Sequence, residues 1–164
     1  MFAPLWTALW FLPPVTAIGI WVAWSDMKFM KIPNKATLAM LLAYLLLGPI
    51  ALPLTAWLWG WALGAAVLVV AFVANAAGLV GGGDAKFAAG MGPFLIGADP
   101  RVVLALFAAC LLAAFAAHRL MRRVPPFRAA TGDWESWQRN DFPMGLALAG
   151  TIIFYFSLSV LFSA

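Results

Sequence analysis

Three aspartates stand at the edges of long apolar stretches, where a charged side chain is costly and usually has a function. Asp26 follows the first apolar stretch, Asp84 follows three consecutive glycines, and Asp141 precedes the last apolar stretch. Two carboxylates that meet can share one proton, because their like charges separate the two pKa values. Such a pair can activate a water molecule and protonate a leaving amine. This chemistry requires neither a metal ion nor a cysteine or histidine.

The remaining acidic side chains have simpler interpretations. Asp99 lies in a short turn between two apolar stretches, where we expect it to cap a helix or to be solvated. Asp133 and Glu135 belong to a polar segment and are expected to be solvated. Asp141 competes with the other two aspartates for a catalytic role, although we expect it to cap the last apolar helix or to pair with Arg139. The sequence therefore favours Asp26 and Asp84.

The composition excludes an ordinary soluble domain. Hydrophobic residues make up 65% of the 164 residues and charged residues only 10%, against about 25% charged in soluble domains. The net charge is +4, but no basic run indicates nucleic-acid binding. A single cysteine, Cys110, permits neither a disulfide framework nor a zinc motif. We expect a membrane protein without a metal ion or a cofactor.

The apolar stretches predict an all-α membrane protein that forms one domain over residues 1–164. A spanning helix needs about 20 apolar residues. Six transmembrane helices are predicted over residues 5–24, 36–52, 55–80, 84–97, 102–117 and 143–161. The fourth has only about 14 residues, or roughly 21 Å, so the glycine loop or Asp84 must lie below the membrane surface.

The basic residues predict the orientation of the chain. With six spans, nine of the ten Lys and Arg residues lie in the connections after the first, third and fifth helices. Cytoplasmic loops carry such an excess of Lys and Arg, so this side is cytoplasmic and both termini lie on the non-cytoplasmic side. The longest connection, 119–142, is then a cytoplasmic loop. Its Trp134 and Trp137 are expected in the lipid headgroup region.

The residues around the two aspartates suggest how they are held. Pro33 should end the first helix near Ile32, and Asn34 is placed to cap the second helix. The three glycines permit backbone conformations closed to other residues and let another chain segment approach closely. Asp84 then opens the fourth helix, where free N–H groups favour an acid. Lys86, two residues later, is expected to reach a lipid headgroup or to orient a substrate.

Three stretches together resemble the type IV prepilin peptidases, a family of membrane aspartic proteases with a GxGD motif. The first stretch is Asp26 followed by Ile32-Pro33-Asn34, and the second runs from Gly81 to Lys86 and fits G-x-G-D-x-K. The third and weaker stretch, 143–145, opens the last span with Pro-Met-Gly. The likeness is closest to the short form of the family, which serves tight-adherence (Flp-type) pilus systems.

The resemblance implies that Asp26 and Asp84 are the catalytic residues. They would remove a basic leader from prepilins at the cytoplasmic face of the bacterial inner membrane, just before the apolar helix of the mature pilin. Prepilins and membrane lipids would be the partners. Longer members also carry a cysteine-rich domain and N-methylate the new terminus, and the lack of that domain here argues against methylation. The supporting and substrate-binding residues implied by the motifs are Gly81, Gly83, Lys86, Pro33 and Asn34.

Other functions fit the sequence less well. Presenilin-like GxGD proteases carry a Tyr-Asp pair and a Pro-Ala-Leu motif, whereas Ser25 precedes Asp26 here and no Pro-Ala-Leu occurs. A small transporter or a pilus or secretion assembly subunit would use the aspartates as ion or proton sites, which usually lie near the bilayer midplane. Asn75 is expected to form a helix–helix hydrogen bond. His118 is expected to lie at the end of the fifth span.

Overall fold

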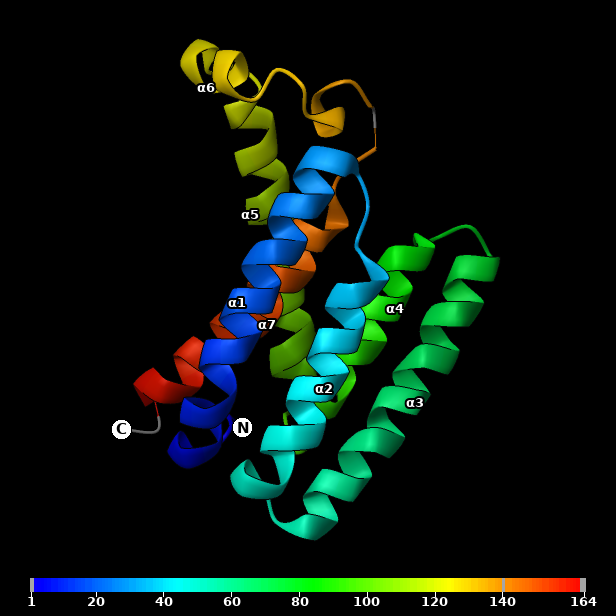
Figure 1. Cartoon of the computed structure of the whole chain (residues 1–164), viewed down its shortest axis with the longest axis vertical. Coiled ribbons are helices and arrows are strands. Elements are labelled where there is room, and N and C mark those ends of the chain that lie inside the picture. Colours follow the sequence, from blue (N-terminus) through cyan, green and yellow to red (C-terminus); the bar gives the residue numbers. More distant parts are fainter. Residues whose placement is uncertain (1, 140, 163–164) are drawn as a thin grey trace.

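The computed structural model describes residues 2–139 and 141–162 and places them in one helical bundle (Figure 1). Its helices run nearly parallel or antiparallel, and short connections join most neighbours. In chain order they are α1 (Leu5–Phe29), α2 (Asn34–Ala51), α3 (Leu54–Ala76), α4 (Gly82–Met91), the 3-10 helix η1 (Gly92–Leu95), α5 (Pro100–Met121), α6 (Pro125–Ala130), the 3-10 helix η2 (Glu135–Trp137) and α7 (Met144–Phe162).

Five of the predicted spans are present as helices that are long and apolar enough to cross a membrane: α1, α2, α3, α5 and α7. The fourth predicted span is the exception. It consists of the 10 residues of α4 and the 4 residues of η1, a length of about 23 Å against a hydrocarbon core of about 30 Å. Figure 1 shows the start of α4 set below the ends of α1 and α5. The helix that carries Asp84 is therefore too short to cross a bilayer unaided.

Buried aromatic side chains from four elements meet inside the bundle. Phe94 of η1 lies edge-to-face against Phe11 of α1, with 4.8 Å between ring centroids, and against Tyr44 of α2 at 5.2 Å. Phe156 of α7 also packs on Phe11. The hydroxyl of Tyr44 donates a hydrogen bond of 3.0 Å to the backbone carbonyl of Trp57, which joins α2 to α3. This core fixes the helices at the end of the bundle where the chain termini lie.

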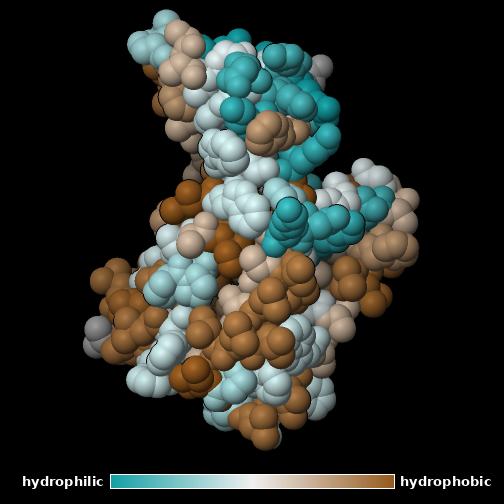
Figure 2. Space-filling model, viewed as in Figure 1, coloured by the Kyte–Doolittle hydropathy of each residue, from teal (hydrophilic) through white to brown (hydrophobic). Residues whose placement is uncertain are grey.

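The surface divides into an apolar body and one polar end. In Figure 1 the N and C labels lie together at the lower end, while α6 and η2 lie at the opposite end. Figure 2 shows hydrophilic residues gathered mainly at this opposite end, with a smaller hydrophilic group at mid-height, and hydrophobic or weakly polar residues over most of the remaining visible face. On α3 the exposed residues include Val69, Val70 and Phe72, each more than 60% exposed. Such a helix face suits lipid contact.

The predicted loop 119–142 begins later than expected and is folded. α5 continues to Met121, and α6 and η2 occupy much of the segment that follows. The prediction that Trp137 lies in the headgroup region is wrong, because its side chain is 2% exposed. Its ring stacks on His118, with centroids 4.9 Å apart, and its Nε1 donates to the backbone carbonyl of Thr131 at 2.9 Å. Burial in the loop's own core outweighs the interfacial preference of this indole.

Candidate active site

Asp26 is held by the first turn of a helix distant in sequence. It lies in the last turn of α1, which ends when Met30 adopts a left-handed conformation with φ of 49° and donates its N–H to the Asp26 carbonyl. The side chain is buried, and its Oδ2 accepts the backbone N–H of Gly145 at 2.7 Å. Gly145 is the second residue of α7, so its N–H has no partner within that helix. Asp26 satisfies this N–H group and meets the positive end of the α7 dipole.

Gly145 leaves no space between α7 and Asp26. A Cβ atom at this position would lie 2.9 Å from both the Cβ and the Oδ2 of Asp26, and 3.1 Å from its Cγ. Carbon atoms in contact normally stay about 3.5–4.0 Å apart. The absence of a side chain at Gly145 therefore permits the hydrogen bond that orders Asp26. The Pro-Met-Gly stretch drew attention to Gly145 in the sequence, but the sequence alone did not indicate what Gly145 does.

Asp84 is held at the start of α4. Asp84 was predicted to open this helix and does lie in its first turn, but as the third helical residue, and Gly81 is the cap residue. Its carboxyl interacts with the backbone N–H groups of Gly81 and of Asp84 itself, an arrangement that resembles half of a capping box. Burial raises the pKa of this carboxyl above its ordinary value, and the two N–H groups oppose that shift by favouring the ionised form.

The three glycines before Asp84 give space rather than unusual backbone angles. These glycines permit conformations closed to other residues but do not adopt them, since the described glycines with positive φ are Gly78 and Gly97. A Cβ at Gly81 would lie 2.6 Å from Oδ2 of Asp84, and one at Gly83 would lie 3.4 Å from Cβ of Ile32. Close approach is thus the physical reason for Gly81, whereas the contact at Gly83 is an ordinary one.

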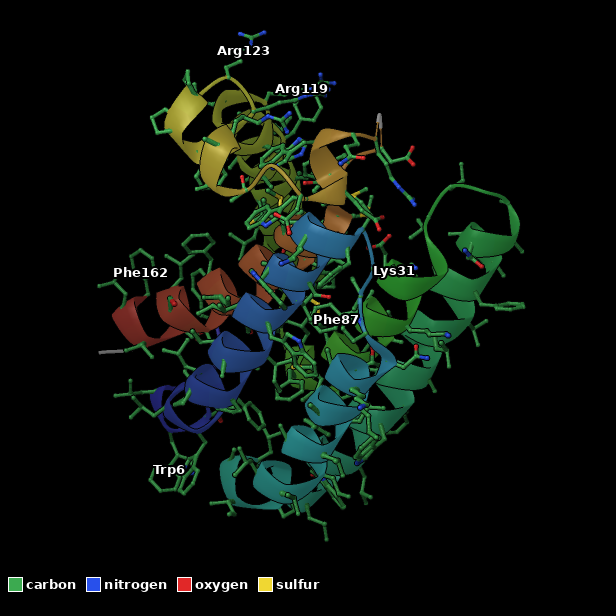
Figure 3. All side chains as sticks on the ribbon, turned by 45° about the horizontal axis from the view of Figure 1, so that its top comes forward. Trp6, Lys31, Phe87, Arg119, Arg123 and Phe162 are labelled. Atoms are coloured by element: carbon green, nitrogen blue, oxygen red, sulfur yellow. The ribbon has the colours of Figure 1, made fainter. Side chains whose placement is uncertain are left out.

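The two aspartates line one cavity. Its volume is about 310 Å³, and it lies between the end of α1, the α1–α2 connection and the glycines that lead into α4. Figure 3 labels Lys31 on that connection, beside the start of α4, and Phe87 in the interior below it. The charges of Asp26 and Asp84 are close enough to interact. The cavity combines two carboxyls with Lys31 and Lys86, which gives it an acidic interior with basic side chains at its border.

The predicted supporting residues lie around this cavity, with changed roles. Pro33, not Asn34, is the cap residue of α2, and α1 ends at Phe29 rather than near Ile32. The side chain of Asn34 instead accepts a hydrogen bond from Nζ of Lys86 at 3.5 Å. This contact joins the start of α2 to α4 at the edge of the cavity.

The other polar candidates lie apart from the two aspartates. Asp141 is exposed and lines a separate cavity of about 230 Å³ with His118 and Arg119. The ion pair that Arg139 makes is with Glu135, at 3.4 Å. In the part of the chain that the structure describes, no three His, Cys, Asp or Glu side chains form a group that could hold a metal ion.

Asn75 and Asp99 each make a local contact. The amide of Asn75 donates to the carbonyl of Val80 at 2.7 Å, so this bond closes the turn before the glycines and is not the predicted helix–helix bond. Asp99 caps α5 as predicted, accepting the N–H of Arg101 at 2.9 Å.

Comparison with models of known protein families assigns the chain to one of them. Residues 15–118 match the model of the type IV leader peptidase family. The chain belongs to this family. None of the curated proteins and none of the solved structures compared with the chain matches it. The matched segment contains both aspartates and both motifs around them, whereas Gly145 lies outside it.

Membership of the type IV leader peptidase family gives the cavity a chemical context. The family is one of peptidases, and a peptidase must supply a nucleophile, an acid for the leaving amine and access for an extended peptide. Two carboxyls on one open cavity can supply the first two through a water molecule.

Proposed function

We propose that this protein is an aspartic endopeptidase that removes the basic leader from type IV, Flp-like prepilins, with Asp26 and Asp84 as its catalytic pair. The observation that carries the proposal is the single cavity that both side chains line, although 58 positions separate them in the sequence. Motif resemblance alone leaves open whether the two acids meet. A shared cavity is what a two-carboxylate mechanism requires.

In this mechanism the pair holds one proton between its two carboxyls. The ionised carboxyl accepts a proton from a water molecule as the water oxygen attacks the scissile carbonyl carbon. The protonated carboxyl donates to the carbonyl oxygen, and a tetrahedral diol forms. As the diol collapses and the C–N bond breaks, one carboxyl donates its proton to the leaving nitrogen and the other takes a proton from a diol hydroxyl, so that the pair again holds one. No metal ion or cofactor enters these steps.

Two features support cleavage at the cytoplasmic face of the bacterial inner membrane. The segments that line the cavity, the end of α1, the α1–α2 connection and the start of α4, lie toward the end of the bundle opposite the two chain termini (Figure 1), where hydrophilic residues gather (Figure 2). Nine of the ten basic residues lie on the same side as the aspartates in the predicted topology, as expected of a cytoplasmic side. A basic leader held in the cytoplasm would approach the aspartates from this end.

Co-expression with a prepilin tests the proposal. Asp26→Asn and Asp84→Asn should each abolish the gel shift that marks leader loss, because an amide can neither accept nor supply the shared proton. Asp141→Asn is the matched control and should process the prepilin normally, since Asp141 lies on a different cavity. A metal chelator should not inhibit. Complete processing by either of the first two variants contradicts the catalytic assignment.

A further inference from the structure

Two apolar grooves run along the outside of the bundle. One, of about 520 Å³, lies between α2, α3 and α4. The other, of about 380 Å³, lies between α5 and α7. Exposed alanines line both, Ala65 on α3 and Ala109 on α5. The two grooves are therefore similar in volume and in apolar lining. Any difference between them in function has to come from where each lies relative to the two aspartates.

The first groove exists because α4 holds α2 and α3 apart. α3 packs on α4 and η1, and α2 packs on α4, but α2 and α3 have few contacts with each other. Small residues let α4 sit deep between them: a Cβ at Gly64 would lie 2.8 Å from Cγ of Pro93, and one at Gly90 would lie 3.2 Å from Cγ2 of Thr37. Gly90 thus forms part of a floor, while Leu38 and Leu68 stand exposed on the two walls.

This groove leads into the cavity that holds the two aspartates. Asn34 and Lys86 line both spaces, and their side chains are hydrogen-bonded at the junction. The groove between α5 and α7 shares no lining residue with that cavity. Among these two grooves, one therefore continues from the candidate active site along the apolar body.

The order of polarity along this path matches one class of polypeptide. The cavity is charged, the junction is polar, and the rest of the groove is almost wholly apolar. A polypeptide with a polar segment, a scissile bond and then an apolar helix could place its polar segment and scissile bond at the charged cavity and its apolar helix in the apolar groove. The lining residues cover eight positions on each of α2, α3 and α4–η1, so that their first and last Cα atoms are about 10 Å or two helical turns apart.

We propose that the groove between α2, α3 and α4 binds the first two turns of the apolar helix that follows the cleavage site of the substrate. This inference rests on the proposed function, because it takes the neighbouring cavity as the place of cleavage. It assigns to the groove the recognition of the membrane-embedded part of the substrate. Ala65 and Leu68 then contact substrate, although neither lies at the aspartates.

A filled groove tests the proposal in purified enzyme in lipid vesicles. Two probes are compared: a single-span prepilin, and a junction peptide in which a polar segment replaces the apolar helix. We expect Ala65→Trp to lower the ratio of kcat/KM for the prepilin to kcat/KM for the junction peptide roughly tenfold, mainly through KM, because the indole excludes the apolar helix from its site. Ala109→Trp, in the other groove, should leave this ratio at the wild-type value.

The outcomes separate the inference from the function beneath it. An unchanged ratio in active Ala65→Trp, or an equal fall in Ala109→Trp, overturns the groove assignment while the peptidase function stands. No cleavage of either probe by the wild-type enzyme overturns the proposed function itself.

Photo-crosslinking gives a measurement that does not depend on how well the fold tolerates tryptophan. A photoreactive phenylalanine analogue replaces Ala65 or Ala109 in the Asp84→Asn background, which is expected to bind prepilin without cleaving it. A crosslink to the prepilin helix from position 65 and none from position 109 supports the proposal. Crosslinks from position 65 to lipid alone, with prepilin present in excess, overturn it.

Discussion

The contact between Gly145 and Asp26 yields the sharpest prediction, because one added methyl group at position 145 is expected to lower the cleavage rate while the protein stays folded. In Gly145→Ala the new Cβ would lie 2.9 Å from Oδ2 and from Cβ of Asp26. A normal contact of about 3.5–4.0 Å requires the Asp26 side chain to retreat by roughly 0.6–1 Å. The hydrogen bond to the N–H of residue 145, now 2.7 Å long, would then stretch beyond the usual limit of about 3.2 Å.

Such a displacement should reduce cleavage more than it reduces stability. A shift of about 1 Å in a catalytic group can cost on the order of 100-fold in rate, which corresponds to about 2.7 kcal/mol in the activation barrier. The steric cost to the fold is about 1–3 kcal/mol, and the better helix propensity of alanine offsets up to about 1 kcal/mol of it. We therefore expect kcat for prepilin cleavage to fall roughly 100-fold, with a folded, monodisperse protein of slightly lowered melting temperature.

Gly150→Ala is the matched control on the same helix. A Cβ at this position would meet Cys110 at 3.5 Å and Phe154 at 3.9 Å, which are ordinary contacts. This variant should keep the wild-type rate and gain up to about 1 kcal/mol in stability from helix propensity. The assay measures kcat in vesicles and thermal unfolding for both variants. Gly145→Ala with a wild-type kcat would refute the argument that this backbone position orders Asp26.

Two further predictions concern Asp84. Gly81→Ala should slow cleavage, because the new Cβ would lie 2.6 Å from Oδ2 of Asp84. Gly82→Ala is the control and should cleave normally, since the atom nearest to its new Cβ, in Asn75, would be 3.8 Å away. Equal rates for the two variants in the prepilin assay would contradict this reasoning. Burial raises the pKa of Asp84, so this carboxyl keeps its proton to higher pH than a free aspartate, whose pKa is about 3.9. As pH rises, kcat/KM should therefore persist above that range and then fall when the pair loses its shared proton, and an alkaline limb centred near the free-aspartate value would count against the role of burial.

The fold class and the positions of the two aspartates could be predicted from sequence because both follow from local composition. Apolar stretches long enough to span a bilayer fix where helices form, and acids at their ends must lie at the bundle's edge. The prediction that Asp26 and Asp84 stand at the edges of apolar stretches agrees with the single cavity they line. Their catalytic role stays a prediction until the variants are tested.

The remaining features of the site depend on packing between distant segments, which the sequence does not reveal. Asp26 and Gly145 are separated by 119 positions, and no local sequence pattern indicates that the backbone N–H of Gly145 faces the carboxyl of Asp26. The glycines before Asp84 permit unusual backbone angles that they do not adopt, whereas the close approach of the Asp84 carboxyl is what requires Gly81. Trp137 was expected at the lipid surface because it lies three positions after Trp134, as on one helical face, but α1, α5 and the loop itself enclose it.

The hydrogen bond from Gly145 to Asp26 also has a consequence for the order of synthesis. A ribosome makes α1 early and α7 after the other described helices, so the nascent chain carries both aspartates long before Gly145 exists. Until α7 inserts, nothing supplies the N–H group that orders the Asp26 carboxyl in the finished bundle. Maturation of the site is thereby coupled to completion of the bundle, and a chain stalled before α7 would present its carboxyls without the geometry to use them.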